Sequence, residues 1–211
     1  DWKVDVAGLK KAVDGFDGFS IVYFVNPNNP TSTVTPASEI ELWVKSKPDN
    51  TLFIADEAYA EYVSDPNFKS MANLIQDGLD NVVLLKTFSK LYAMAGMRVG
   101  FAVGAPAIIK MMKDQVAGEK LNYPGVTAAL VSLDDEPFQE YSRASNLESR
   151  KILASCFDKL GVKYLPSSTN FMFFELNEPI HAFQKKMAAR NILVGRPFPP
   201  AMTWCRISLG T

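Results

Sequence analysis

The side chains of this chain that can do chemistry stand shortly after apolar runs. They supply an amide, a carboxylate, a phenol, an amine and a guanidinium. A primary amine can condense with an aldehyde, while a carboxylate and a guanidinium can bind the charged groups of a small molecule. This set contains the parts that are needed to hold and use an aldehyde cofactor. In chain order the five residues are Asn29, Asp56, Tyr59, Lys90 and Arg98.

The apolar runs themselves predict buried β-strands at residues 20–25, 51–55, 82–85 and 99–103. Each run is almost continuously apolar, which is typical of parallel strands that are covered on both faces. Open parallel sheets bind ligands at the carboxyl ends of their strands. We therefore predict an α/β fold with a mostly parallel sheet, helices on both faces, and a site where the first three runs end.

Helical patterns separate these strands. Thr35 can cap a helix that has Pro36 in its first turn and that ends before Pro48. Gly78 is expected to end a second, shorter helix. The helices that follow the first one are predicted at 71–76, 105–116, 126–133 and 138–160.

The last third of the chain has an α+β pattern, with a helix predicted over 180–189. Its strands are predicted at 162–165, 171–176, 192–194 and 205–208. The domain change is placed at the start of the long helix. We therefore expect a large-domain part over residues 1–135 and a smaller α+β domain over residues 136–211.

Composition excludes some classes of function. The 211 residues are 47% apolar and 21% charged, and the net charge of −1 gives no electrostatic footprint for nucleic acid or anionic lipid. No apolar stretch approaches the roughly 20 residues that span a bilayer. Cys156 and Cys205 have no metal-like spacing, so no metal site is expected. The only histidine, His181, stands at a predicted helix start and is given no catalytic role.

The ends of the chain do not read as natural ends. It begins with Asp1 and stops shortly after an apolar run, so we expect it to be a fragment of a longer protein.

Four motifs and one terminal segment occur in a fixed order along the chain. They are Asn26-Pro27-Asn28-Asn29-Pro30-Thr31, Asp56-Glu57-Ala58-Tyr59, Thr87-Phe88-Ser89-Lys90, Gly96-Met97-Arg98-Val99-Gly100-Phe101 and Cys205-Arg206-Ile207-Ser208-Leu209-Gly210. In this order they resemble the motifs of the class I/II, fold-type I pyridoxal-phosphate aminotransferases, and most closely the histidinol-phosphate aminotransferase branch. The resemblance extends over essentially the whole chain.

The resemblance implies that the cofactor is pyridoxal 5′-phosphate and gives each residue a role. Lys90 would form the Schiff base with the cofactor's aldehyde. Asp56 would pair with the pyridine nitrogen and keep it protonated. Asn29 and Tyr59 would donate hydrogen bonds to the phenolic oxygen. The phosphate would be bound by Arg98, with the hydroxyls of Thr87 and Ser89 at the predicted start of a helix.

The same resemblance assigns the substrate contacts. Arg206 would bind the substrate's α-carboxylate, and Asn170 matches a second position near that carboxylate. Glu57, beside Asp56, is interpreted as structural. The chain departs from the family at Ser32, where a glycine is usual. If the backbone there has positive φ, serine costs roughly 1 kcal/mol or more.

The sequence predicts an aminotransferase that moves an amino group from an amino acid or amine phosphate to a 2-oxo acid through Lys90. A threonine-phosphate-type decarboxylase and a non-catalytic sensor domain of a transcription regulator are the alternatives. The resemblance implies a homodimer in full-length form. The charge balance and the lack of a long apolar stretch predict no nucleic-acid or membrane partner, and we expect a cytoplasmic location. Because family elements that precede the first motif cannot be assigned, we expect the 211 residues alone to bind the cofactor poorly or not at all.

Overall fold

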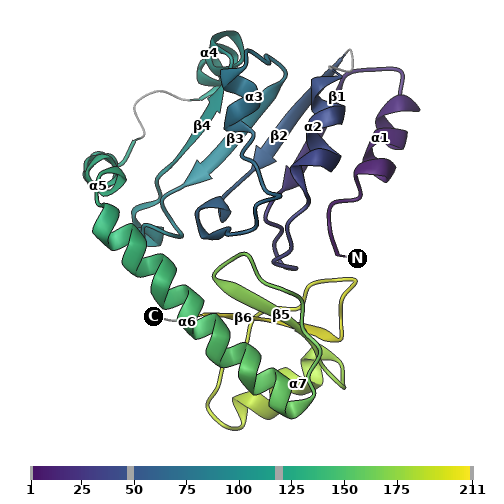
Figure 1. Cartoon of the computed structure of the whole chain (residues 1–211), viewed down its shortest axis with the longest axis vertical. Coiled ribbons are helices and arrows are strands. Elements are labelled where there is room, and N and C mark those ends of the chain that lie inside the picture. Colours follow the sequence, from purple (N-terminus) through teal and green to yellow (C-terminus); the bar gives the residue numbers. More distant parts are fainter. Residues whose placement is uncertain (1, 47–49, 117–120, 210–211) are drawn as a thin grey trace.

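The computed structural model describes residues 2–46, 50–116 and 121–209, and Figure 1 shows two sheets joined by one long helix. The first sheet contains β1 (Ser20–Val25), β2 (Thr51–Asp56), β3 (Val82–Thr87) and β4 (Gly100–Gly104). The second contains β5 (Phe171–Glu175) and β6 (Trp204–Ser208). The α-helices are α1 (Val6–Asp14), α2 (Ala37–Lys45), α3 (Ala72–Gln76), α4 (Pro106–Gln115), α5 (Tyr123–Leu133), α6 (Glu136–Leu160) and α7 (Ile180–Ala188). Two short 3₁₀ helices are η1 (Ala60–Tyr62) and η2 (Ala95–Met97).

The first sheet has the order β1-β2-β3-β4 and is mostly parallel, as predicted. β1 pairs with β2, and β2 with β3, in parallel, but β4 runs antiparallel to β3. The apolar run at 99–103 favoured a parallel strand, which is wrong for β4, while the predicted mostly parallel sheet is confirmed. The connection over residues 88–99 contains only turns and η2, whereas a parallel return needs a crossover of a dozen or more residues that is usually an α-helix.

The main core lies between this sheet and the first three helices. Val22 and Phe24 on β1 and Phe53 on β2 are buried, and they pack against Trp43 and Val44 of α2. Apolar side chains of α1 and α3 complete this cluster. Burying one such large apolar side chain contributes about 1.5–3 kcal/mol relative to leaving it exposed.

The opposite face of the same sheet is open at β1. Ile21 and Tyr23 are 61% and 54% exposed, although their neighbours Val22 and Phe24 are buried. Alternate residues of a strand point to opposite faces, so this pattern shows helices on only one face of β1 among the described residues. The near-continuous apolar run had predicted burial on both faces.

The helix ends match some of the local sequence signals and depart from others. Gly78 and Gly161 have positive φ just after α3 and α6, as expected of glycines that end helices. Thr35, predicted to cap α2, instead accepts a hydrogen bond from the Val4 N–H at 3.0 Å, and Pro36 is the N-cap. Helix α1 was not predicted, and its N-cap Asp5 accepts from the Gly8 N–H.

The second sheet is smaller than predicted. β5 and β6 are antiparallel and lie against α6 and α7 through apolar side chains. The strand predicted at 162–165 is reduced to one bridge between Tyr164 and Phe174, because Pro166 follows and cannot extend the ladder. Residues 192–194 form no strand, because no described segment forms a β-bridge with them and the Ile192 N–H instead bonds the Met187 carbonyl at the end of α7. We propose that the two sheets belong to two domains, residues 1–135 and 136–211.

No described helix is both long enough and apolar enough to span a bilayer.

Ser32 gives a test of the backbone strain that was expected at this position. Its φ is +63° and its side chain is fully buried. We expect Ser32→Gly to raise the free energy of unfolding by about 1 kcal/mol, because glycine adopts this conformation without the Cβ penalty. The measurement is urea denaturation of the protein expressed from its complete reading frame. Ser38→Gly, on the exposed face of α2, is the control and should lower that free energy by a few tenths of a kcal/mol. Equal destabilisation by both changes would contradict the assignment of strain to Ser32.

Candidate active site

The parallel register brings the carboxyl ends of β1, β2 and β3 level with one another. Val25 pairs with Asp56, and Asp56 pairs with Leu85. The pairing continues by one bond beyond each strand, because the Asn26 N–H donates to the Asp56 carbonyl and the Glu57 N–H donates to the Leu85 carbonyl, each at 3.0 Å. The loops that carry the predicted site residues therefore leave the sheet at one edge.

A set of contacts runs from Lys90 to Arg206 across segments far apart in the sequence. The Lys90 ammonium lies 5.1 Å from the centre of the Tyr59 ring, and the Tyr59 ring meets Phe171 edge-on at 5.1 Å. The Arg206 guanidinium lies 4.8 Å from the Phe171 ring centre and donates a 2.8 Å hydrogen bond to the Asn29 amide oxygen. Four of the predicted site residues are thus joined through Phe171.

Asn170 lies close to this set. Lys90 and Asn170 line the same cavity, whose volume is about 280 Å³. Tyr62, on η1, lines it too, and burial raises the pKa of Tyr62 to about 12, with the charges of Glu61 and Tyr59 acting in the same direction. The Tyr62 phenol therefore stays protonated at ordinary pH and lines the cavity without a charge.

Asp56 is half-buried and has two neutral donors. Its Oδ1 accepts from the Ala58 N–H at 3.0 Å, and its Oδ2 accepts from the Tyr23 hydroxyl at 2.7 Å. The cationic partner predicted for this carboxylate is the protonated ring nitrogen of the cofactor. These donors keep the carboxylate hydrogen-bonded without cancelling its charge.

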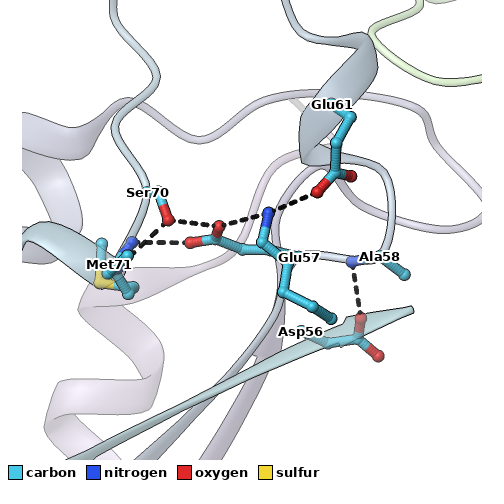
Figure 2. A network of polar contacts seen from close by, with 8 residues as sticks. Asp56, Glu57, Ala58, Glu61, Ser70 and Met71 are labelled. Carbon is cyan, nitrogen blue, oxygen red and sulfur yellow. Dashed lines mark hydrogen bonds and ion pairs between the residues drawn. The ribbon is translucent and has the colours of Figure 1, made fainter. Parts of the chain in front are cut away.

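Glu57 points away from this edge into a buried network (Figure 2). Its carboxylate accepts from the Met71 N–H and the Ser70 hydroxyl, each at 2.7 Å, and lies 3.4 Å from the Lys86 ammonium. Lys86 also pairs with Glu61 at 2.8 Å. The network ties the segment that carries Asp56 to the start of α3, so Glu57 has the structural position that the sequence analysis gave it.

Thr87 and Ser89 form a turn and not the start of a helix. The Ser89 N–H donates to the Thr87 hydroxyl at 3.1 Å, and no helix follows in residues 88–94. The expectation of a helix N-terminus here was wrong. Ala93 takes a positive φ and the Met94 N–H bonds back to the Phe88 carbonyl, which closes the chain into a loop.

Arg98 follows η2 with φ +55° and is exposed. Its guanidinium donates to the Ala95 carbonyl at 2.7 Å. A guanidinium has five N–H donors, so this bond leaves capacity for an anion.

Two arginines near the site were not singled out from the sequence. Arg150 on α6 donates to the Ser167 and Thr169 carbonyls at 2.6 and 3.0 Å, and so fixes the loop that carries Asn170. Burial lowers the pKa of Arg150. Arg196 lies over the Phe198 ring at 4.3 Å, on which Arg206 also lies at 5.3 Å. Arg150 lies within the helix predicted over 138–160, and no motif or spacing in the sequence marked it as a site residue.

Comparison with known proteins identifies the family. The family described as aminotransferase class I and II matches residues 1–211. The chain belongs to this family. Among its curated members, the histidinol-phosphate aminotransferase of Moorella thermoacetica is 33% identical over 90% of this chain, and histidinol-phosphate aminotransferase 2 of Legionella pneumophila (strain Lens) is 32% identical over 100%. The chain covers 50% and 57% of the lengths of these two relatives.

Solved structures of this aminotransferase family have the same fold. A protein of Erwinia carotovora atroseptica, provisionally named histidinol-phosphate aminotransferase, has a TM-score of 0.97 and 56% identity over 100% of this chain and 61% of its own. The histidinol-phosphate aminotransferase of Sinorhizobium meliloti, solved with pyridoxal-5′-phosphate, has a TM-score of 0.88 and 26% identity over 97% of this chain and 56% of its own. The predicted family and fold class are confirmed.

No group of three or more His, Cys, Asp or Glu side chains in residues 2–46, 50–116 and 121–209 is placed to hold a metal ion.

The Glu57 network predicts a pH dependence of stability. Burial raises the pKa of Glu57 above 4.5, although Lys86, Met71 and Ser70 oppose the shift. The folded protein therefore binds this proton more tightly than the unfolded chain, so the contribution of Glu57 to stability falls as pH rises from 4.5 through the raised pKa. In Glu57→Gln this loss should be absent, which denaturation curves over that pH range would measure. Glu41→Gln, in a partly exposed pair on α2, is the control and should follow the wild type. A Glu57→Gln curve parallel to the wild type would contradict the prediction.

Proposed function

We propose that this chain acts in a pyridoxal 5′-phosphate-dependent aminotransferase that moves an amino group from an amino acid or amine phosphate to a 2-oxo acid. The observation that supports it most is the contact set from Lys90 through Tyr59 and Phe171 to Arg206 and Asn29. It joins an amine that can bind an aldehyde to a guanidinium that can bind a carboxylate. The activity named for the relatives in the family agrees with it.

The donor set at the strand ends fits this cofactor. The Asp56 carboxylate keeps its negative charge beside two neutral donors, as a partner of a protonated ring nitrogen must. The Asn29 oxygen is used by Arg206, so the amide N–H groups can donate to an anionic oxygen, as can the buried Tyr59 phenol. Thr87, Ser89 and Arg98 would hold the phosphate. The relative from Sinorhizobium meliloti was solved in complex with pyridoxal-5′-phosphate.

When bound, the cofactor supplies an aldehyde for amines and a ring that withdraws electrons from the substrate's α-carbon. The protein's part is to attach, orient and move protons. The Lys90 amine would bind the cofactor, be displaced from it by the amino group of the donor, and as a free amine take and return the α-proton as base and acid. The Arg206 fork would hold the substrate carboxylate, with Asn170 beside it.

A second guanidinium, that of Arg196, contacts the Phe198 ring that Arg206 also contacts. The two guanidiniums lie 4.3 and 5.3 Å from the centre of that ring, so they are within about 10 Å of each other, a range over which both positive charges attract an acidic group of a substrate. We include Arg196 in the proposed substrate site.

The proposal also includes a homodimer, a cytoplasmic location, and no nucleic-acid or membrane partner.

Borohydride reduction tests the cofactor and its lysine together. The protein expressed from its complete reading frame is incubated with pyridoxal phosphate, reduced and digested. Mass analysis should find a reduced pyridoxyl adduct on Lys90, and none in Lys90→Ala. An adduct elsewhere would contradict the assignment. Keto acid as the product supports an aminotransferase, whereas carbon dioxide would indicate a decarboxylase, and binding without turnover a sensor domain.

The role of Arg206 is tested by Arg206→Lys. A lysine keeps the charge but loses the planar fork, which should raise the KM for the amino donor about 10- to 100-fold, and more than it lowers kcat. Steady-state kinetics with varied donor measure both constants. Arg190→Lys is the control, because Arg190 donates to a carbonyl near its own helix end and is exposed. A KM equal to that of the control would contradict a carboxylate contact.

A further inference from the structure

A hydrogen bond on the open face of the first sheet links a strand tyrosine to the site. Tyr23 pairs with Ile54 across the β1–β2 ladder, and Asp56 lies two residues beyond Ile54 on the same face. Diagonal neighbours in a sheet lie within reach of an aromatic side chain. The Tyr23 hydroxyl bridges this diagonal and donates to Asp56 Oδ2 at 2.7 Å. The strand register therefore sets the contact.

The two oxygens of Asp56 have one donor each. The Ala58 N–H, in the turn after β2, occupies Oδ1, and Tyr23, from the neighbouring strand, occupies Oδ2. Two donors from different segments fix the plane of the carboxylate, which one donor could not do alone. Each oxygen keeps lone-pair capacity for a further partner.

Tyr23 suits this position because it is a neutral donor. A lysine or arginine in its place would cancel the carboxylate's charge, whereas a phenol leaves that charge available to a cationic partner. Burial, then the hydrogen bond and charge of Asp56, raise the pKa of Tyr23 to about 12. The hydroxyl thus stays protonated and donating at ordinary pH.

We propose that Tyr23 is a positioning residue that orients the Asp56 carboxylate toward the ring nitrogen of the cofactor. This inference rests on the proposed function. It assigns a role to a side chain outside all of the motifs, on the strand face that the described helices leave open. Tyr23 acts through Asp56 and touches neither substrate nor reacting atoms.

The test measures cofactor affinity with and without a ring nitrogen. Tyr23→Phe, in the protein expressed from its complete reading frame, should bind pyridoxal phosphate about 10-fold more weakly than the wild type, as expected for loss of a hydrogen bond to a charged group. With the 1-deaza analogue, which has carbon in place of the ring nitrogen, wild type and variant should have the same Kd within about twofold, because the oriented carboxylate then has nothing to pair with. Fluorescence titration measures both Kd values.

Tyr164→Phe is the matched control. Its hydroxyl donates to the Asp158 carboxylate at 3.0 Å, on the other domain and away from the site. This variant should bind both compounds as the wild type does. Tyr23 is 54% exposed, so Tyr23→Phe should keep the thermal midpoint of the wild type, which checks that folding is intact.

Each outcome has a defined meaning. If Tyr23→Phe binds pyridoxal phosphate as the Tyr164→Phe control does, the positioning role is wrong while the proposed function stands. If the weakening persists with the 1-deaza analogue, Tyr23 acts on packing and not through Asp56, and the proposal is also wrong. If the wild type itself does not bind pyridoxal phosphate, the proposed function fails and the inference fails with it.

Discussion

The candidate site depends on the parallel register of β1, β2 and β3. Because side chains alternate along a strand, burial of Phe53 and Ala55 against the helices turns Ile54 and Asp56 to the open face. A slip of one residue would turn Asp56 into the core and away from Tyr23. The apolar core under α2 thus decides the direction of the carboxylate. The burial that fixes the strand register therefore also fixes the face of the sheet on which the Asp56 carboxylate lies.

The second constraint is the contact between the two sheets. Arg206 on β6 reaches Asn29 after β1, although 177 residues separate them. The Ser168 N–H bonds the Ser32 carbonyl at 2.9 Å, so the loop before Asn170 lies on the same turn. The proposed substrate groups therefore come from the second sheet and its loops, and the proposed cofactor groups from the first sheet and the loops that follow its strands. Any shift between the sheets would change the distance between them.

Asp56 and Glu57 show how position separates two neighbouring acids. Asp56 is the last residue of β2 and faces the open side with neutral donors. Glu57 begins the turn and is buried among Lys86, Ser70 and Met71 (Figure 2). One charge stays available to a ligand, and the other is used within the fold. Environment, and not residue type, separates the two roles.

The sequence by itself determined the family, the fold class and the strand ends at which the site residues stand. Apolar runs followed by Asp56 or Lys90 carry that information locally, because burial and turn chemistry depend on neighbouring residues. The antiparallel β4, the open face of β1 and the turn after Thr87 were not determined in this way, since each depends on which segments pair or pack. Tyr23, Arg150 and Arg196 gained their roles only in the tertiary structure, because their partners lie on other elements or across an aromatic ring. The order of residues does not contain those distances, because the pairing of β1 with β2, the packing of α6 on the loop before β5 and the fold of the loop at Phe198 create them.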